Sequence, residues 1–205
     1  MAVPAGELEK HEKPYRGWST NEMIRTGLPP KAALALRRLL EGNEQYRRGN
    51  RNLQGPRKFE QGRPHNQTMD PYAVVITCSN PPVPLENIFS VEIGELFVLS
   101  ISGNTVSPME LSSVEHALAI LGPSLVLILG FSEEYRDQGI PDQDAQQNSP
   151  AEEKRICQLK SVKNSMMILN KSALFTRMRK AGVAALVGGL YNKETGQVAI
   201  HYYDV

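Results

Sequence analysis

Cys78 is the residue of this sequence best placed for chemistry. It ends the run Tyr72–Thr77, whose apolar and β-branched residues show no polar alternation, a pattern that predicts a strand buried on both faces of a parallel sheet. Three prolines follow closely, and proline cannot continue the hydrogen-bonded ladder of a strand. Because ligands of open α/β sheets bind just beyond the carboxyl ends of the strands, a thiol at this point is a candidate site residue.

The elements that would position this thiol follow from the pattern of apolar residues. Three further buried strands are predicted at Glu95–Ser102, Ser124–Gly130 and Val183–Tyr191. A final strand at Gln197–Tyr203 is predicted to pair antiparallel with the strand before it. Helices are predicted at Ser19–Thr26, Pro30–Arg48, Leu85–Ser90, Ser107–Leu121, Ile156–Asn170 and Leu174–Ala181. The expected fold class is α/β: a central, mostly parallel β-sheet of four parallel strands plus an antiparallel C-terminal edge strand, flanked by helices and preceded by an N-terminal helical arm.

Local signals mark the starts of two helices. The stretch Ser107–Glu110 combines a serine cap, a proline at the first helical position and a glutamate three residues after the cap, which together are typical of a capping box. Ser19 or Thr20 can cap the earlier helix, with Glu22 in its first turn. His116 lies off the apolar face of its predicted helix, so we expect a surface histidine rather than a metal ligand.

Length and composition limit the classes of protein that this chain can be. At 205 residues it suits one well-buried domain, so we expect an arm over residues 1–29 and a single α/β domain over 30–205 with a polar loop insertion at 133–155. A net charge of +1 favours neither a nucleic acid nor a membrane as partner. The N-terminal residues are charged and polar, and two cysteines do not form a disulfide framework, so the expected location is cytoplasmic.

The segment around Cys78 resembles the first metal-site segment of the β-class carbonic anhydrases, where Cys-x-Asp-x-Arg and a Val-Pro-x-Glu-like continuation follow a buried strand. Cys78 and Val83–Glu86 match this pattern. Gly103-Asn104 and the closing phrase Leu186–Tyr191 also resemble the family, and the likeness runs from about residue 28 to residue 200. The resemblance implies the family's fold, its zinc-dependent hydration of carbon dioxide, and a dimer in which the N-terminal segment packs on the neighbouring protomer.

The chain departs from that family at the catalytic positions. Asn80 and Pro82 stand where the family has its Asp-Arg pair. The family's Gly-His-x-x-Cys motif supplies two further zinc ligands, but here Phe131 takes the histidine position and Glu134 the cysteine position. A catalytic zinc needs three protein ligands and an open position for water, and of the family's set only Cys78 remains. We therefore expect no zinc cofactor.

These residues together predict a β-carbonic-anhydrase-like protein with a degenerate pocket formed by Cys78, Asn80, Phe131 and Glu134. It would be inactive in zinc-hydroxide chemistry and act as a non-catalytic structural, regulatory or binding homologue, so its status as an enzyme is open. The alternatives are carbon dioxide hydration with an unusual metal or a metal-free site, a zinc site rebuilt with His65, and a nucleophilic enzyme in which Cys78 acts with Glu134. The expected partner is a second copy, in a homodimer or higher homo-oligomer; a hetero-oligomer with an active relative is the alternative.

Overall fold

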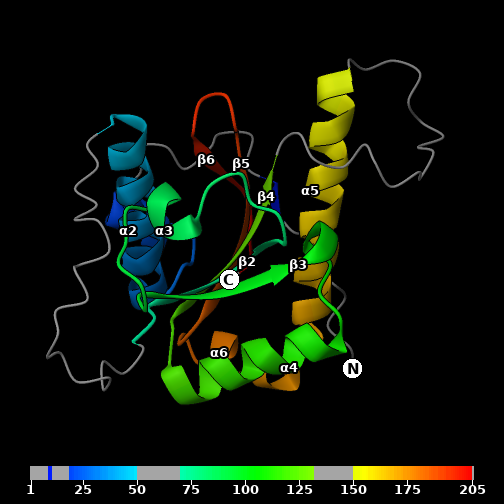
Figure 1. The fold of residues 1–205 in the computed structure, drawn as a ribbon. Helices are drawn as coiled ribbons and strands as arrows, with labels where there is room; N and C mark the ends of the chain where they lie inside the picture. Colours follow the sequence, from blue (N-terminus) through cyan, green and yellow to red (C-terminus); the bar gives the residue numbers. More distant parts are fainter. Residues whose placement is uncertain (1–8, 11–18, 50–69, 132–149, 205) are drawn as a thin grey trace, which may run out of the picture.

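A single twisted sheet carries helices on both of its faces (Figure 1). The computed structural model describes residues 9–10, 19–49, 70–131 and 150–204. The strand order is β1-β6-β5-β4-β2-β3, with β1 Glu9–Lys10, β2 Ala73–Cys78, β3 Leu96–Ile101, β4 Leu125–Phe131, β5 Ala185–Tyr191 and β6 Val198–Asp204. The central strands β3, β2, β4 and β5 are parallel, and β6 is antiparallel to β5. The predicted fold class is confirmed, and the two residues of β1 pair with the outer side of β6.

Alternate residues of the central strands pack against two different helical layers, because successive side chains of a strand point to opposite faces. In β2, Ala73 and Val75 belong to one core cluster, whereas Val74 and Ile76 belong to the other. The layer on the first cluster is formed by α1 Thr20–Arg25, α2 Pro30–Arg47 and α3 Leu85–Ile88. The opposite layer is formed by α4 Pro108–His116, its π-helical continuation Ala117–Leu121, α5 Pro150–Leu169 and α6 Ala173–Lys180. Figure 1 shows α2 and α3 on one side of the sheet and α5 on the other.

Both predicted helix starts are confirmed. The Ser107 side chain caps α4, and the Glu110 carboxylate in turn accepts from the Ser107 backbone N–H at 2.9 Å. Ser19, rather than Thr20, caps α1 through the same reciprocal pair of hydrogen bonds with Glu22. These contacts span three residues, which is why the sequence reveals them.

Glycines allow α5 to lie close against the sheet. A Cβ atom on Gly188 of β5 would lie 2.6 Å from Val162 Cγ1 and 2.7 Å from Met166 Sδ, both on α5. A Cβ atom on Gly130 of β4 would lie 2.7 Å from Leu190 Cδ2. Real Cβ contacts are longer than this, so any larger residue would push the helix or its side chains outward.

Asn43 of α2 joins three separate parts of the chain. Its side chain is 3% exposed, and its Nδ2 donates to the carbonyl oxygens of Ile88 at 3.1 Å and Gly196 at 2.9 Å. Its Oδ1 accepts from the backbone N–H of Val198 at 2.9 Å. The helix, the end of α3 and the turn between β5 and β6 are thereby held in fixed relative positions, and the buried amide is fully used.

The start of α5 corrects one boundary of the predicted loop. The polar insertion was expected over 133–155, but α5 already begins at Pro150. Proline is favoured in the first turn of a helix and the residues after it are good helix formers, so a helix begins there without an apolar stripe. The part of the predicted loop before Pro150 lies outside the described residues, as does Trp18 of the predicted arm. Within the described ranges, no helix combines the length and the apolar composition needed to cross a bilayer.

Candidate functional site

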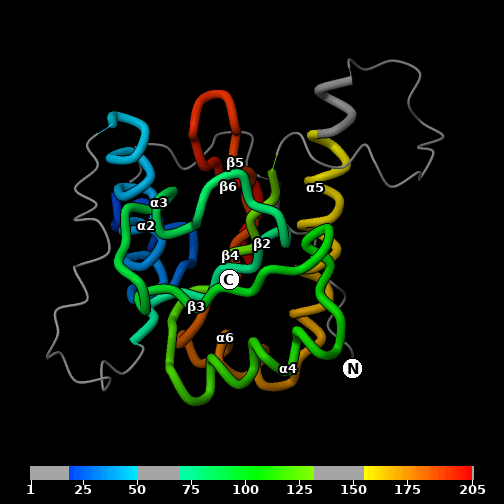
Figure 2. Tube along the Cα trace, in the orientation of Figure 1, coloured from blue at the N-terminus to red at the C-terminus, as the bar shows by residue number. Residues whose placement is uncertain are grey.

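The candidate site lies at the carboxyl edge of the sheet, where the β2–α3 connection and the β5–β6 turn come to the same end of the molecule (Figure 2). Cys78 is the last residue of β2 and pairs in register with Ile101 of β3. Its thiol is free and half-buried, and it packs against the core cluster beneath α2. The neighbouring Thr77 is fully buried and its hydroxyl donates to the carbonyl oxygen of Leu129 at 3.3 Å.

Phe131 ends β4 at this edge, but its side chain belongs to the hydrophobic core. It is 1% exposed, and its ring meets the ring of Tyr191 edge-on with centroids 5.7 Å apart. Tyr191 lies opposite Phe131 in the register of β4 and β5. Its hydroxyl lies 3.4 Å from the hydroxyl of Tyr46 on α2. Burial raises the pKa of Tyr191, and the hydrogen bond with Tyr46 adds to this shift, so Tyr191 is a neutral phenol at physiological pH.

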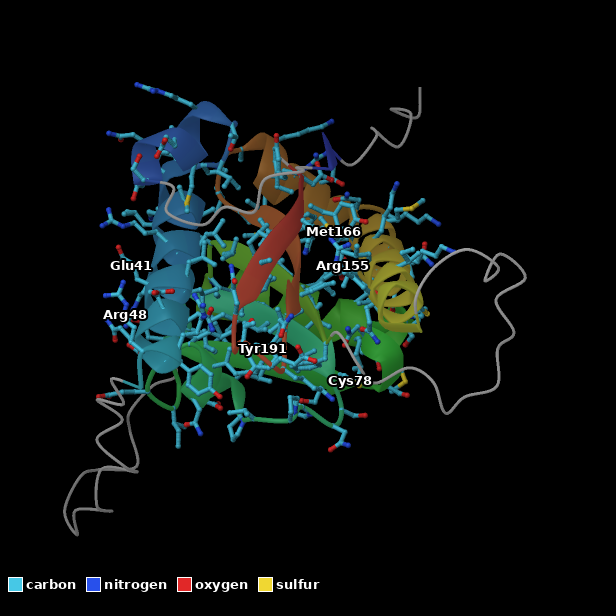
Figure 3. The ribbon with its side chains drawn as sticks, turned by 90° about the horizontal axis from the view of Figure 1, so that it is seen from above. Glu41, Arg48, Cys78, Arg155, Met166 and Tyr191 are labelled. Atoms are coloured by element: carbon cyan, nitrogen blue, oxygen red, sulfur yellow. The ribbon has the colours of Figure 1, made fainter. Side chains whose placement is uncertain are left out.

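Seen from the carboxyl edge, Cys78 and Tyr191 lie between the two helical layers, with Glu41 and Arg48 of α2 on one side and Arg155 of α5 on the other (Figure 3). Tyr191 was identified from the sequence only as the end of a buried strand. Tyr46 was placed only on the predicted helix. The position of these two tyrosines beside Phe131 depends on strand register and on how α2 crosses the sheet. No local sequence pattern reveals either of these.

The turn after β3 lies at the carboxyl edge of the sheet and contacts α5. Asn104 has a left-handed backbone conformation, with φ of 55°, and is fully buried. Its carbonyl oxygen accepts from the Ser165 hydroxyl, and the carbonyl oxygen of Gly103 accepts from the Ser161 hydroxyl, so two serines of α5 hold this turn. Neither polar atom of the Asn104 side chain has a hydrogen-bond partner among the described residues. No local sequence pattern points to the two serines, because they lie about sixty residues away along the chain.

Three of the four predicted pocket residues lie in the described part of the chain, and they differ in exposure. Cys78 is half-buried, Asn80 is exposed, and the Phe131 ring is enclosed in the core. Glu134 lies outside the described residues, as does His65. His116 is exposed on α4, as predicted.

Within the described part of the chain, the donors at this edge are fewer than the three protein ligands of a catalytic zinc. At the strand ends described here, Cys78 is the single side chain with a strong zinc-binding atom, and a phenyl ring has no lone pair to offer at position 131. Among the described ranges, no three His, Cys, Asp or Glu side chains lie together in a group that could hold a metal ion. A site with one thiolate ligand cannot fix the geometry that a zinc-bound water needs.

The central part of the chain matches a known protein family. Residues 73–133 match the family model described as carbonic anhydrase. The chain is 30% identical over 89 residues to carbonic anhydrase 2 of Mycobacterium tuberculosis, an alignment that covers 38% of this chain and 43% of the relative. It is 29% identical over 96 residues to a carbonic anhydrase of Mycolicibacterium smegmatis, covering 47% and 46%. The chain thus spans less than half the length of the curated relatives it matches.

Solved structures share the fold over a larger part of the chain. A tetrameric β-carbonic anhydrase of the fungus Sordaria macrospora superposes with a TM-score of 0.58 at 17% identity, covering 67% of this chain and 84% of that one. The β-carbonic anhydrase CcaA superposes with a TM-score of 0.61 at 20% identity, covering 82% and 98%. The central segment of the chain is thus similar to the carbonic anhydrase family, and its fold is that of the solved β-carbonic anhydrases.

Proposed function

We propose that this protein is a β-carbonic-anhydrase homologue that has lost zinc-hydroxide chemistry and acts as a non-catalytic structural, regulatory or binding protein. The observation that carries the proposal is the environment of Phe131. Its ring is 1% exposed and packs edge-on against Tyr191, so the position that supplies an imidazole ligand in the resembled family contributes instead to the core.

The remaining residues support the same conclusion. Zinc-hydroxide chemistry depends on a metal held by three protein ligands, which lowers the pKa of a bound water to near neutrality. Asn80 offers a neutral amide that cannot ionise, and Pro82 carries no charge. A carboxylate at Glu134 would bring the count of donors to two with Cys78, one fewer than a catalytic zinc requires.

Metal content and hydration activity test the proposal together. Protein purified without chelator should contain far less than one zinc per chain by elemental analysis, and should not accelerate carbon dioxide hydration above the buffer rate. The double variant Phe131→His, Glu134→Cys serves as the positive control and should gain zinc. Near-stoichiometric zinc with hydration activity in the unmodified protein would overturn the proposal and favour the alternative, a carbonic anhydrase with an unusual site.

Self-association is part of the proposal. β3 is an edge strand with no partner on its outer side among the described strands, and its sequence, LFVLSI, is apolar apart from one serine. An exposed apolar edge favours pairing with another chain. The Sordaria macrospora relative is described as tetrameric, which supports a homo-oligomer for this chain too. Light scattering coupled to size-exclusion chromatography should give a mass of at least two chains, and a monomer at micromolar concentration would refute this part.

The domain division and the location are also part of the proposal. An arm over residues 1–29, a single domain over 30–205 and a cytoplasmic location remain predictions. The free, unpaired thiols of Cys78 and Cys157 are compatible with a reducing compartment.

A further inference from the structure

The turn after β3 carries a buried amide whose hydrogen-bonding groups are unused by the described residues. Asn104 is 0% exposed, and neither Oδ1 nor Nδ2 of its side chain has a hydrogen-bond partner there. The turn itself is held in the interior, because the Ser165 hydroxyl donates to the Asn104 carbonyl oxygen and accepts from the backbone N–H of Val106 at 3.2 Å. Buried amides in proteins are almost always paired, so we expect a partner for this side chain that is not a protein group.

A second buried amide lies close to the first. Gln158 of α5 is 4% exposed. A Cβ atom on Gly130 of β4 would lie 3.0 Å from Gln158 Oε1 and 3.3 Å from Asn104 Nδ2. The oxygen accepts hydrogen bonds and the nitrogen donates them, so an acceptor and a donor converge on one point. Glycine at position 130 keeps side-chain carbon out of the space between the two amides.

The dimensions and the polarity of this space suit a water molecule. Hydrogen bonds join oxygen and nitrogen atoms that are about 3 Å apart, so an oxygen atom near this point reaches both amides. Leu190 Cδ2 would lie only 2.7 Å from the same point, so the oxygen is displaced away from this methyl group and a larger molecule does not fit beside it. Both amides are uncharged, which favours a neutral molecule over an ion in a buried position.

We propose that Asn104, Gln158 and Gly130 form a binding site for one buried water molecule, which accepts from Asn104 Nδ2 and donates to Gln158 Oε1. Such a water joins the turn after β3 to α5 where both lie against β4, and buried waters with this role are costly to remove. Gly130 faces α5, whereas the next residue, Phe131, packs in the core cluster under α2. The water site is therefore on the opposite face of the sheet from Phe131, and it does not depend on the proposed loss of zinc chemistry.

Water-selective nuclear Overhauser spectroscopy on the ¹⁵N-labelled full chain tests this site. The side-chain NH₂ protons of Asn104 should show a cross-peak to water with the sign that a bound molecule gives. Asn43 is the internal control, because its NH₂ group is also buried but donates to the carbonyl oxygens of Ile88 and Gly196. The Asn43 NH₂ protons should show no such cross-peak.

Gly130→Ala tests the position of the water. The new methyl group would occupy the space between the two amides, so the cross-peak of Asn104 should disappear. Gly188→Ala is the matched control, since it also adds a methyl group against α5, but 2.6 Å from Val162 Cγ1 rather than beside either amide. Its Asn104 cross-peak should be retained, and the dispersion of the amide spectrum shows whether each variant is folded.

Gln158→Met provides a second variant that removes the acceptor with little change in volume, and the cross-peak should fall by about half or more because one of the two hydrogen bonds is lost. Absence of the cross-peak in the unmodified chain would overturn the assignment. An unchanged cross-peak in folded Gly130→Ala or in Gln158→Met would also overturn it, since the signal would then come from the exchanging hydroxyl proton of Ser165. An equal loss in Gly188→Ala would assign the effect to repacking of α5 and would likewise count against the site. No outcome depends on metal content or hydration activity, so a failure here leaves the proposed function standing.

Discussion

Gly42 lies where α2 contacts the end of α3. Its replacement by alanine tests how the loop between Cys78 and α3 is positioned. A Cβ atom on Gly42 would lie 1.7 Å from the carbonyl oxygen of Phe89 and 2.7 Å from its carbonyl carbon. The same contact includes a hydrogen bond from the Ser90 hydroxyl to the Gly42 carbonyl oxygen at 2.9 Å. Since α3 follows directly on the loop after Cys78, this contact holds one wall of the candidate site.

Two opposing effects decide the magnitude. In an exposed helix, replacing glycine by alanine would stabilise the protein by about 1 kcal/mol. Here the backbone of Phe89 would have to retreat by more than an ångström, and overpacking of this kind costs about 3 kcal/mol at the upper end of its usual range. Loss of the Ser90 hydrogen bond adds about 1 kcal/mol. The net prediction for Gly42→Ala is a loss of about 3 kcal/mol in the free energy of unfolding.

Urea unfolding followed by circular dichroism measures this change. With a slope of about 2 kcal/mol per molar urea, the midpoint should fall by about 1.5 M. Lys31→Ala, at an exposed position of the same helix, is the control and should shift the free energy by no more than about 0.5 kcal/mol. If Gly42→Ala unfolds at the same urea concentration as the unmodified chain or at a higher one, α2 and α3 do not lie in close contact at Gly42, and the reasoning is refuted.

Three further predictions follow from single contacts. Asn43→Leu removes three hydrogen bonds and leaves buried backbone groups unpaired, so it should lower the free energy of unfolding by about 3 kcal/mol in the same assay; a change below about 1 kcal/mol would contradict the three-way contact. Cys78 is half-buried and should react with iodoacetamide more slowly than free cysteine at neutral pH, measured by mass spectrometry; faster labelling would support a nucleophilic role. Hydrogen bonds from the Ser107 side chain and backbone lower the pKa of Glu110, so its stabilisation is present above the ordinary carboxyl pKa and lost as pH falls through the lower folded value. The difference in Tm between the unmodified chain and Glu110→Gln should therefore shrink between neutral pH and about pH 3, and a constant difference would argue against the capping box.

The strands and most helices could be predicted because their signals are local. Uninterrupted apolar runs mark β2 and β4 as buried strands, and the serine caps act over three residues. The first turns of α5 were missed for the same reason, since the polar residues after Pro150 show no apolar stripe. Of the residues at the candidate site, the sequence points to Cys78 and Phe131. Tyr46 and Tyr191 come beside Phe131 only through the crossing of α2 over the sheet.

The pattern of residue types alone predicts the α/β class, a thiol at the end of the first long strand and a phenylalanine at the end of the third. The surroundings of the phenylalanine ring, in contrast, follow only from the tertiary structure. The Phe131 ring packs on Tyr191, 60 residues later in the chain, because β5 is the neighbour of β4 in the sheet. The lysines of α5 are likewise present in the sequence, but their exposure depends on which face of α5 packs on the glycines of the sheet. Residue types and short-range hydrogen bonds are properties of the chain, whereas contacts between distant strands and helices exist only once the strand order is fixed.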